Sequence, residues 1–95
     1  MVSRAVAVTT DPDGRRVRLG EEQWAHIKAE HRNLRPHLRD ITAAVREPDR
    51  LLRGRRPEER YYAQGVGPDT WIKVVVHYEG ERGSIATAFP RSRFP

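Results

Sequence analysis

Residues 71–78 read WIKVVVHY, and this β-branched stretch predicts the central strand of a β-sheet. Successive side chains of a strand point to opposite faces of its sheet. The even-numbered residues are aliphatic or aromatic and predict the face that packs on the core. The odd-numbered residues add Lys73 and His77 to apolar groups. This second face is suited to hold a polar, anionic ligand.

Elements of two kinds are expected in separate blocks around this strand. The turn sequence DPDG at 11–14 predicts a hairpin between strands 5–10 and 15–19. Two helices should follow, from Gly20 to about Arg32 and from Pro36 to Pro48. Further strands are expected at residues 51–52, 60–64 and 84–89. The predicted class is α+β: an N-terminal β-hairpin, and two helices packed on one face of a three- to four-stranded antiparallel sheet whose other face is open.

Length and composition predict one domain, residues 1–95, with a flexible tail at 90–95 after Pro90 stops the last strand. The chain has no cysteine, so it can form neither a disulfide framework nor a cysteine-based zinc site. No apolar run approaches the ~20 residues of a membrane span, and no signal-peptide stretch opens the sequence. We therefore expect a cytoplasmic protein without membrane contact.

The charge of the chain points to an anionic partner. Its formal net charge is +5 and its pI is about 10.4, values typical of proteins that bind nucleic acid or acidic proteins. Arginines make up all but two of the 18 basic residues, and arginine favours bidentate contacts with phosphate or carboxylate. A GC-rich genome that supplies arginine codons explains the same bias without any ligand.

A histidine continues the apolar stripe of the first predicted helix. Trp24, Ile27 and His31 fall at i, i+3 and i+7, on one side of the helix. A histidine there is either packed and bonded to the backbone or faces a site. His26 lies off this stripe, five residues away.

Five short motifs then follow one another in a recognisable order: WAHIKAEH at 24–31, PD at 48–49, YY at 61–62, KVVV at 73–76 and ATAF at 86–89. From about residue 17 to 89 this order resembles the phage- and toxin-type members of the barnase, EndoU, colicin and RelE-like (BECR) nuclease superfamily. The resemblance implies a compact RelE- or barnase-like ribonuclease domain that needs no metal. Such domains are often the toxin of a toxin–antitoxin pair or are carried by phages.

The resemblance also implies site residues. The positions that match the catalytic pattern of the group are His26, His31, Lys73 and Thr87. Further residues are predicted to contact RNA through charge or ring stacking, namely Arg32, Arg46, Arg56, Arg60, Tyr62, His77 and Arg91. His77 shares a sheet face with Lys73, but about 13 Å of strand separates the two residues, too far for both to bind one phosphate. His77 is therefore a secondary candidate.

Metal-free RNA cleavage needs a base for the 2′-hydroxyl proton, an acid for the leaving 5′-oxygen, and cations for the charge on the phosphate. Histidine suits both proton roles because its ordinary pKa is about 6.5. We predict no metal and no cofactor, because His26 and His31 lack the i, i+4 spacing of helical metal pairs and have no carboxylate cluster beside them.

Three functions fit these observations. The first is a toxin-type ribonuclease that acts on cellular RNA and has a small antitoxin protein as its partner. The second is a non-catalytic module of the same fold that binds RNA or an acidic protein. The third is a domain whose histidines only pack. The oligomeric state stays open.

Overall fold

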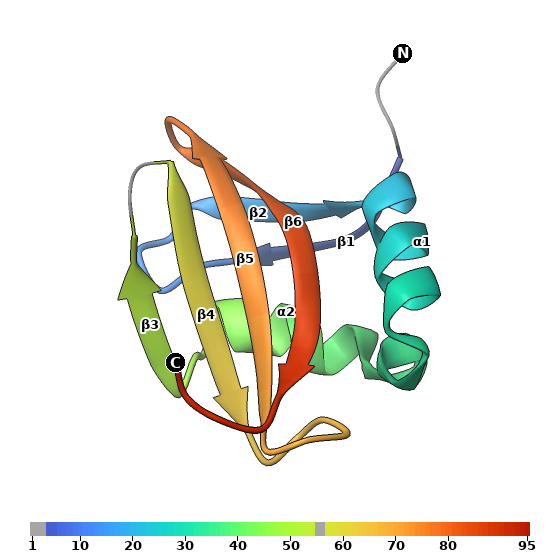
Figure 1. Ribbon diagram of the computed structural model, residues 1–95. Coiled ribbons are helices and arrows are strands. Elements are labelled where there is room, and N and C mark those ends of the chain that lie inside the picture. The colour runs from blue at the N-terminus through green and yellow to red at the C-terminus, as the bar shows by residue number, and fades with distance from the viewer. Residues whose placement is uncertain (1–3, 55–56) are drawn as a thin grey trace.

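The computed structural model describes residues 4–54 and 57–95 (Figure 1). Its elements, in chain order, are β1 (Ala5–Thr10), β2 (Arg16–Gly20), α1 (Glu21–Glu30), the 3-10 helix η1 (Arg32–His37), α2 (Leu38–Arg46), β3 (Arg50–Arg53), β4 (Glu58–Gln64), β5 (Trp71–Glu79) and β6 (Arg82–Arg91). The predicted α+β class is confirmed. No helix in the described ranges is long and apolar enough to span a membrane.

All these strands form one mixed sheet in the order β1-β2-β6-β5-β4-β3. The expectation of a three- to four-stranded antiparallel sheet was wrong in strand number and in direction. β2 pairs with β6 in parallel, with Arg16–Arg18 opposite Arg82–Ser84, and this pairing merges the N-terminal hairpin with the remaining strands. The helices lie between β2 and β6 in sequence, and they belong to the crossover connection that a parallel pair requires.

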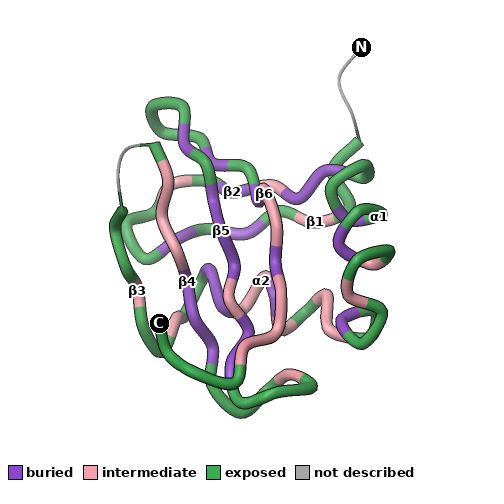
Figure 2. The backbone as a smooth tube through the Cα atoms, in the orientation of Figure 1, coloured by how far each residue is buried: buried purple, intermediate pink, exposed green. Residues whose placement is uncertain are grey.

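The core lies on the predicted face of β5. Ile72, Val74 and Val76 are completely buried. Figure 1 shows α2 crossing behind the sheet and α1 standing beside β6, and the buried residues gather along β2, β4 and β5 (Figure 2). The helical segments contribute the core residues Trp24, Ile27, Leu34, Ile41, Ala44 and Val45. Within residues 4–54 and 57–95, the sheet face opposite α2 carries no helix, and we call it the open face.

The first helix ends two residues earlier than predicted, at Glu30. His31 has φ −130° and ψ 78°, outside the helical region, while its N–H still donates to the carbonyl oxygen of Ile27 at 2.8 Å. Pro36 lies inside η1, and α2 begins only at Leu38. His37, with φ −110° and ψ 24°, lies outside the helical region and separates Pro36 from the start of α2. His31 therefore lies in the bend between α1 and η1.

A β-bulge decides which face the last strand presents. Val75 pairs with Thr87 and Val76 pairs with Ile85, so β6 has one additional residue, Ala86, at this point. The extra residue places Thr87 on the open face and leaves Ile85 in the core, although an unbroken strand would put both on one face.

β6 also extends beyond its predicted end, through Pro90 to Arg91. Proline is tolerated in a strand with a free edge, and β6 pairs with β2 only at residues 82–84. After β6, Phe94 packs against Tyr62 and Trp71. The mobility expected of residues 90–95 stays a prediction.

Candidate functional site

His31 and Lys73 contact the same phenyl ring, that of Phe89. The imidazole stacks on this ring with a centroid distance of 5.9 Å and an interplanar angle of 30°. Nζ of Lys73 lies 5.3 Å from the centroid of the ring. Phe89 and Lys73 are register partners on β6 and β5, and His31 approaches them from the end of α1. Two of the four predicted catalytic residues are thus neighbours of one aromatic ring.

The Lys73 ammonium sits among rings and other cations. It lies 5.8 Å from the centroid of the Tyr62 ring, and among the described residues it makes no ion pair. Burial lowers the pKa of Lys73 below its ordinary value, and the positive charges of Arg60 and Arg91 lower it further. An ammonium in such surroundings gains from a bound anion, which would offset the repulsion.

The positive charge of the strands is concentrated on the open face. Register places these cationic residues there: Arg16, Arg18, Arg50, Arg60, Lys73, Arg82 and Arg91. The same register places only two carboxylates there among the strand residues, Glu58 and Glu79. The excess, seven minus two, equals the net charge of +5 of the whole chain. This face therefore attracts anions more strongly than the helical side.

Thr87 and His77 share the open face without joining the contact between His31 and Lys73. Thr87 is half-buried opposite Val75, and no hydrogen bond of its hydroxyl group is found in the described part of the chain. His77 is exposed further along β5, with Nε2 3.4 Å from a carboxylate oxygen of Glu58. Thr87 is thus available to a ligand on the open face, and His77 lies toward its far end.

His26 is directed away from this group. Its side chain is 60% exposed on α1, and its Nε2 lies 2.9 Å from a carboxylate oxygen of Glu30, one turn along the helix. No described contact links the His26 ring with His31, Phe89 or Lys73. The structure separates the two histidines that the resemblance had grouped, as five residues of helix require.

The predicted RNA-binding residues fall in three places. Arg60 and Arg91 flank Lys73 on the open face, where Arg60 pairs with Glu58 at 2.9 Å. Arg32 is exposed directly after His31. Arg46 ends α2 on the opposite side of the sheet. Arg56 lies outside the described residues.

Tyr62, opposite Lys73 on β4, lies on the open face, but its side chain is covered. Only 1% of the residue is exposed, because Phe94 packs edge-on against its ring with a centroid distance of 4.8 Å. Tyr62 can stack on a base only where Phe94 moves away.

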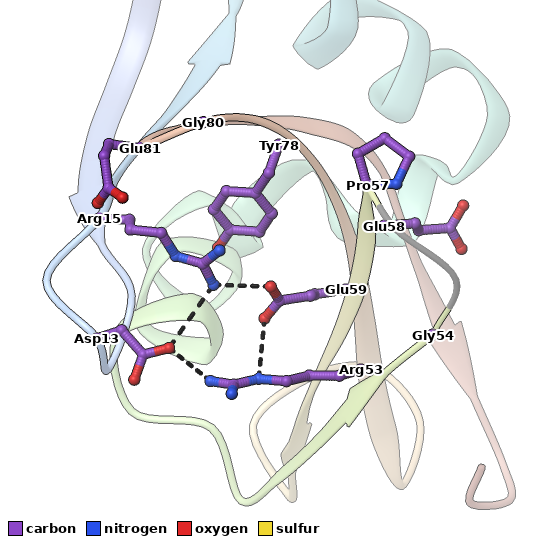
Figure 3. A pocket seen from close by; sticks show the side chains of 10 residues that line it. All are labelled: Asp13, Arg15, Arg53, Gly54, Pro57, Glu58, Glu59, Tyr78, Gly80 and Glu81. Carbon is purple, nitrogen blue, oxygen red and sulfur yellow. Dashed lines mark hydrogen bonds and ion pairs between the residues drawn. The ribbon is translucent and has the colours of Figure 1, made fainter.

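A second polar region, which the sequence analysis missed, surrounds a cavity of about 670 Å³ at the other end of the sheet (Figure 3). The β1–β2 turn, the start of β4 and the β5–β6 turn meet there. Arg15 lies with its guanidinium 3.8 Å from the centroid of the Tyr78 ring. It donates to Asp11 at 2.7 Å and to Glu59 at 2.7 Å.

Asp11 is the buried centre of this network. Its carboxylate accepts hydrogen bonds from the Tyr78 hydroxyl at 2.8 Å and from two backbone N–H groups of the turn. Burial alone would raise the pKa of Asp11, but the hydrogen bonds from Tyr78 and Arg15 outweigh it and lower the pKa. Burial raises the pKa of Tyr78, and it raises the pKa of Tyr61 to about 12.

These groups satisfy one another, so the network is suited to tie the turns together. In the described ranges, no buried side-chain nitrogen or oxygen lacks a partner. Two signals in the sequence could have identified it. Asp11 opens a turn in the position from which an aspartate bonds backbone N–H groups, and Tyr78 ends the core face with a hydroxyl group that needs a buried partner.

The comparisons with known proteins leave the resemblance as a prediction. No protein-family model matches the chain, and searches of curated proteins and of solved structures found no match.

Proposed function

We propose that the protein is a metal-independent ribonuclease of toxin type that cleaves RNA by transphosphorylation. The observation that carries the proposal is the contact of His31 and Lys73 with one Phe89 ring, on the face that holds the excess of positive charge. An imidazole, an ammonium and flanking guanidinium groups are the functional groups that metal-free RNA cleavage requires.

In this proposal, His31 transfers one of the two protons. It lies in the bend after α1 beside β6, close to the cationic face. Lys73 is the candidate for the second proton, since burial and the neighbouring Arg60 and Arg91 lower its pKa and a lysine with a lowered pKa is a better proton-transfer group near neutrality. The same arginines stabilise the charge that builds up on the phosphate, and Thr87 binds a phosphate oxygen.

The chemistry follows from the substrate. The base removes the proton of the 2′-hydroxyl, whose oxygen attacks the adjacent phosphorus, and the bond to the 5′-oxygen breaks as the acid protonates that oxygen. The products are a 2′,3′-cyclic phosphate and a 5′-hydroxyl. The 2′-hydroxyl requirement restricts cleavage to RNA, and general acid–base catalysis contributes about 10²–10⁴-fold to the rate.

A protein partner of this enzyme would cover the open face. We propose a small acidic antitoxin in the cytoplasm, because the seven cations on this face are complementary to an acidic surface. The second candidate function is binding without cleavage. The concentration of positive charge supports it independently of any histidine.

Incubation of the pure protein with total tRNA and rRNA in EDTA tests the proposal. We expect cut ends that carry 2′,3′-cyclic phosphate, and we expect loss of cleavage in His31→Ala and Lys73→Ala variants that remain folded. His26→Ala is the matched control, since the His26 ring faces solvent on α1, and this variant should cleave like the wild type. RNA that stays intact but is bound in a salt-sensitive way would favour the binding module.

A further inference from the structure

Three aromatic rings form a cluster on the open face, next to Lys73. The rings of Tyr62 and Trp71 meet edge-on at 6.2 Å, and the ring of Phe94 lies 4.8 Å from Tyr62 and 5.2 Å from Trp71. Figure 1 shows that the segment after β6 runs across the sheet face opposite α2. The two inner rings thus fix the plane of the outer one.

Only the outer ring of this cluster is accessible. Tyr62 and Trp71 are 1% and 8% exposed, whereas Phe94 is 37% exposed. A phenyl ring with one side packed on other rings and one side open to solvent is a suitable surface for a planar ligand. The ordering of the ring by its neighbours lowers the entropy that a ligand must remove on binding.

A continuous row of contacts connects this ring with the proposed catalytic residues. Phe94 contacts Tyr62, whose ring is 5.8 Å from Nζ of Lys73, which in turn lies 5.3 Å from the Phe89 ring stacked on His31. Tyr62, Lys73 and Phe89 are register partners across β4, β5 and β6. Neighbouring strands are about 4.8 Å apart, so roughly 10 Å separate the outer two. One or two nucleotides of an extended RNA strand cover such a span.

We infer that the Phe94 ring is a base-stacking subsite for single-stranded RNA. The ring receives an unpaired base while Lys73 and Arg60 bind the backbone beside it. The inference rests on the proposed function for the position of the cut: the stacked base belongs to a nucleotide one or two positions from the scissile phosphate. Stacking on a protein ring requires a base that has left its own stack, so the subsite selects single strands over duplexes.

Binding and cleavage are measured separately to test this subsite. A 2′-O-methyl RNA tetranucleotide carries no free 2′-hydroxyl, so it reports binding without cleavage. Its anisotropy titration uses the intact oligonucleotide, versions with an abasic position at each site in turn, and a duplex of the same sequence. The protein variants are Phe94→Leu, which keeps an apolar cover over Trp71, and Phe94→Tyr, which keeps the ring.

Stacking of one base on an aromatic side chain contributes about 1–3 kcal/mol, so Phe94→Leu should weaken binding about five- to 150-fold. Phe94→Tyr should bind like the wild type. One abasic position should weaken binding to the wild type by a similar factor and have little effect on Phe94→Leu. The abasic series also tests the wild type directly, whether or not Phe94→Leu folds.

Wild-type affinity of a folded Phe94→Leu variant would overturn the subsite, as would equal binding of the duplex or uniform tolerance of abasic positions. Stronger competition by polyglutamate than by the tetranucleotide would assign the face to an acidic protein instead. A different result would refute the proposed catalysis. If binding depends on the Phe94 ring but natural RNA stays intact, the subsite is kept and catalysis is refuted. Cleavage at the wild-type rate by a folded Phe94→Leu variant would instead keep the proposed catalysis and refute the subsite.

Discussion

Replacement of Asp11 tests whether its hydrogen-bond network stabilises the end of the sheet that surrounds the cavity. Its side chain is 0% exposed. One carboxylate oxygen accepts the backbone N–H groups of Asp13 and Arg15, and the other accepts Nε of Arg15 and the Tyr78 hydroxyl. Asp11→Asn keeps the shape of the side chain and removes its charge. If the amide oxygen keeps the hydrogen bonds from the turn, the new NH₂ group faces the side-chain Nε–H of Arg15. Two hydrogen-bond donors then point at each other.

The cost follows from these contacts. Two charge-assisted hydrogen bonds are lost, each worth about 1.5–3 kcal/mol, and the remaining partner Arg15 is mostly buried, at 18% exposure. We therefore expect Asp11→Asn to lower the free energy of unfolding by about 3–5 kcal/mol, the range found when one partner of a buried pair is removed. For a domain of this size the melting temperature should fall by about 12 °C or more.

Urea denaturation followed by circular dichroism at pH 7 measures this loss, with Asp13→Asn as the matched control in the same turn. Asp13 is 52% exposed and pairs with the exposed Arg53, so its replacement should cost less than about 1 kcal/mol. Because the pKa of Asp11 is lowered in the folded protein, its stabilisation is complete above the unfolded pKa of about 3.9 and disappears as the pH falls through the folded pKa. The gap between wild type and Asp11→Asn should therefore narrow in acid.

Two results would refute this reasoning. Asp11→Asn could lose no more stability than Asp13→Asn at pH 7, which would mean that the buried carboxylate is not the centre of the network. Alternatively, the gap between wild type and Asp11→Asn could stay constant as the pH falls below the unfolded pKa of Asp11, which would separate its stabilisation from its charge.

Three further changes have defined outcomes. Arg60→Ala should make the slope of log binding constant against log salt concentration shallower by about 0.7–0.9 for RNA. Arg46→Ala, on the helical side of the sheet, should leave this slope unchanged. Anisotropy titrations over a salt series compare the two variants. Phe89→Leu should lower kcat for RNA cleavage up to about 10²-fold at unchanged KM, because misplaced catalytic groups cost that much; activity of Phe89→Leu equal to that of Phe89→Tyr would contradict this role. Gly83→Ala should destabilise the protein by about 1–3 kcal/mol, since its Cβ would lie 2.7 Å from a ring carbon of Tyr78; an unchanged melting temperature would count against the packing described.

Local patterns were sufficient to predict most elements but not their pairing. The alternation of residues 71–78 predicted the core face of β5, and the turn at 11–14 predicted the hairpin, because both depend on neighbouring residues. The parallel contact of Arg16 with Arg82 joins opposite ends of the chain and has no local signal. The bulge at Ala86 also has no local sequence signal, although it determines which face Thr87 occupies.

The candidate site shows the same division. Lys73 was placed on the open face by strand alternation alone, and the structure agrees. His31 was expected on a helical stripe, but it lies in the bend after α1, where it reaches Phe89. The covering of Tyr62 by Phe94 could not be predicted, because it depends on the path of residues 92–95 across the sheet.

The parallel contact between β2 and β6 also affects how the chain must fold. The hairpin of residues 5–20 has no neighbour in the sheet until β6 is in place, so its docking is a late, non-local event of the kind that slows folding. Before that event, β2 and β6 each present a row of unpaired backbone groups. Such unpaired edges can pair with the strands of other chains. We therefore expect this protein to be most prone to aggregate before the hairpin has docked on β6.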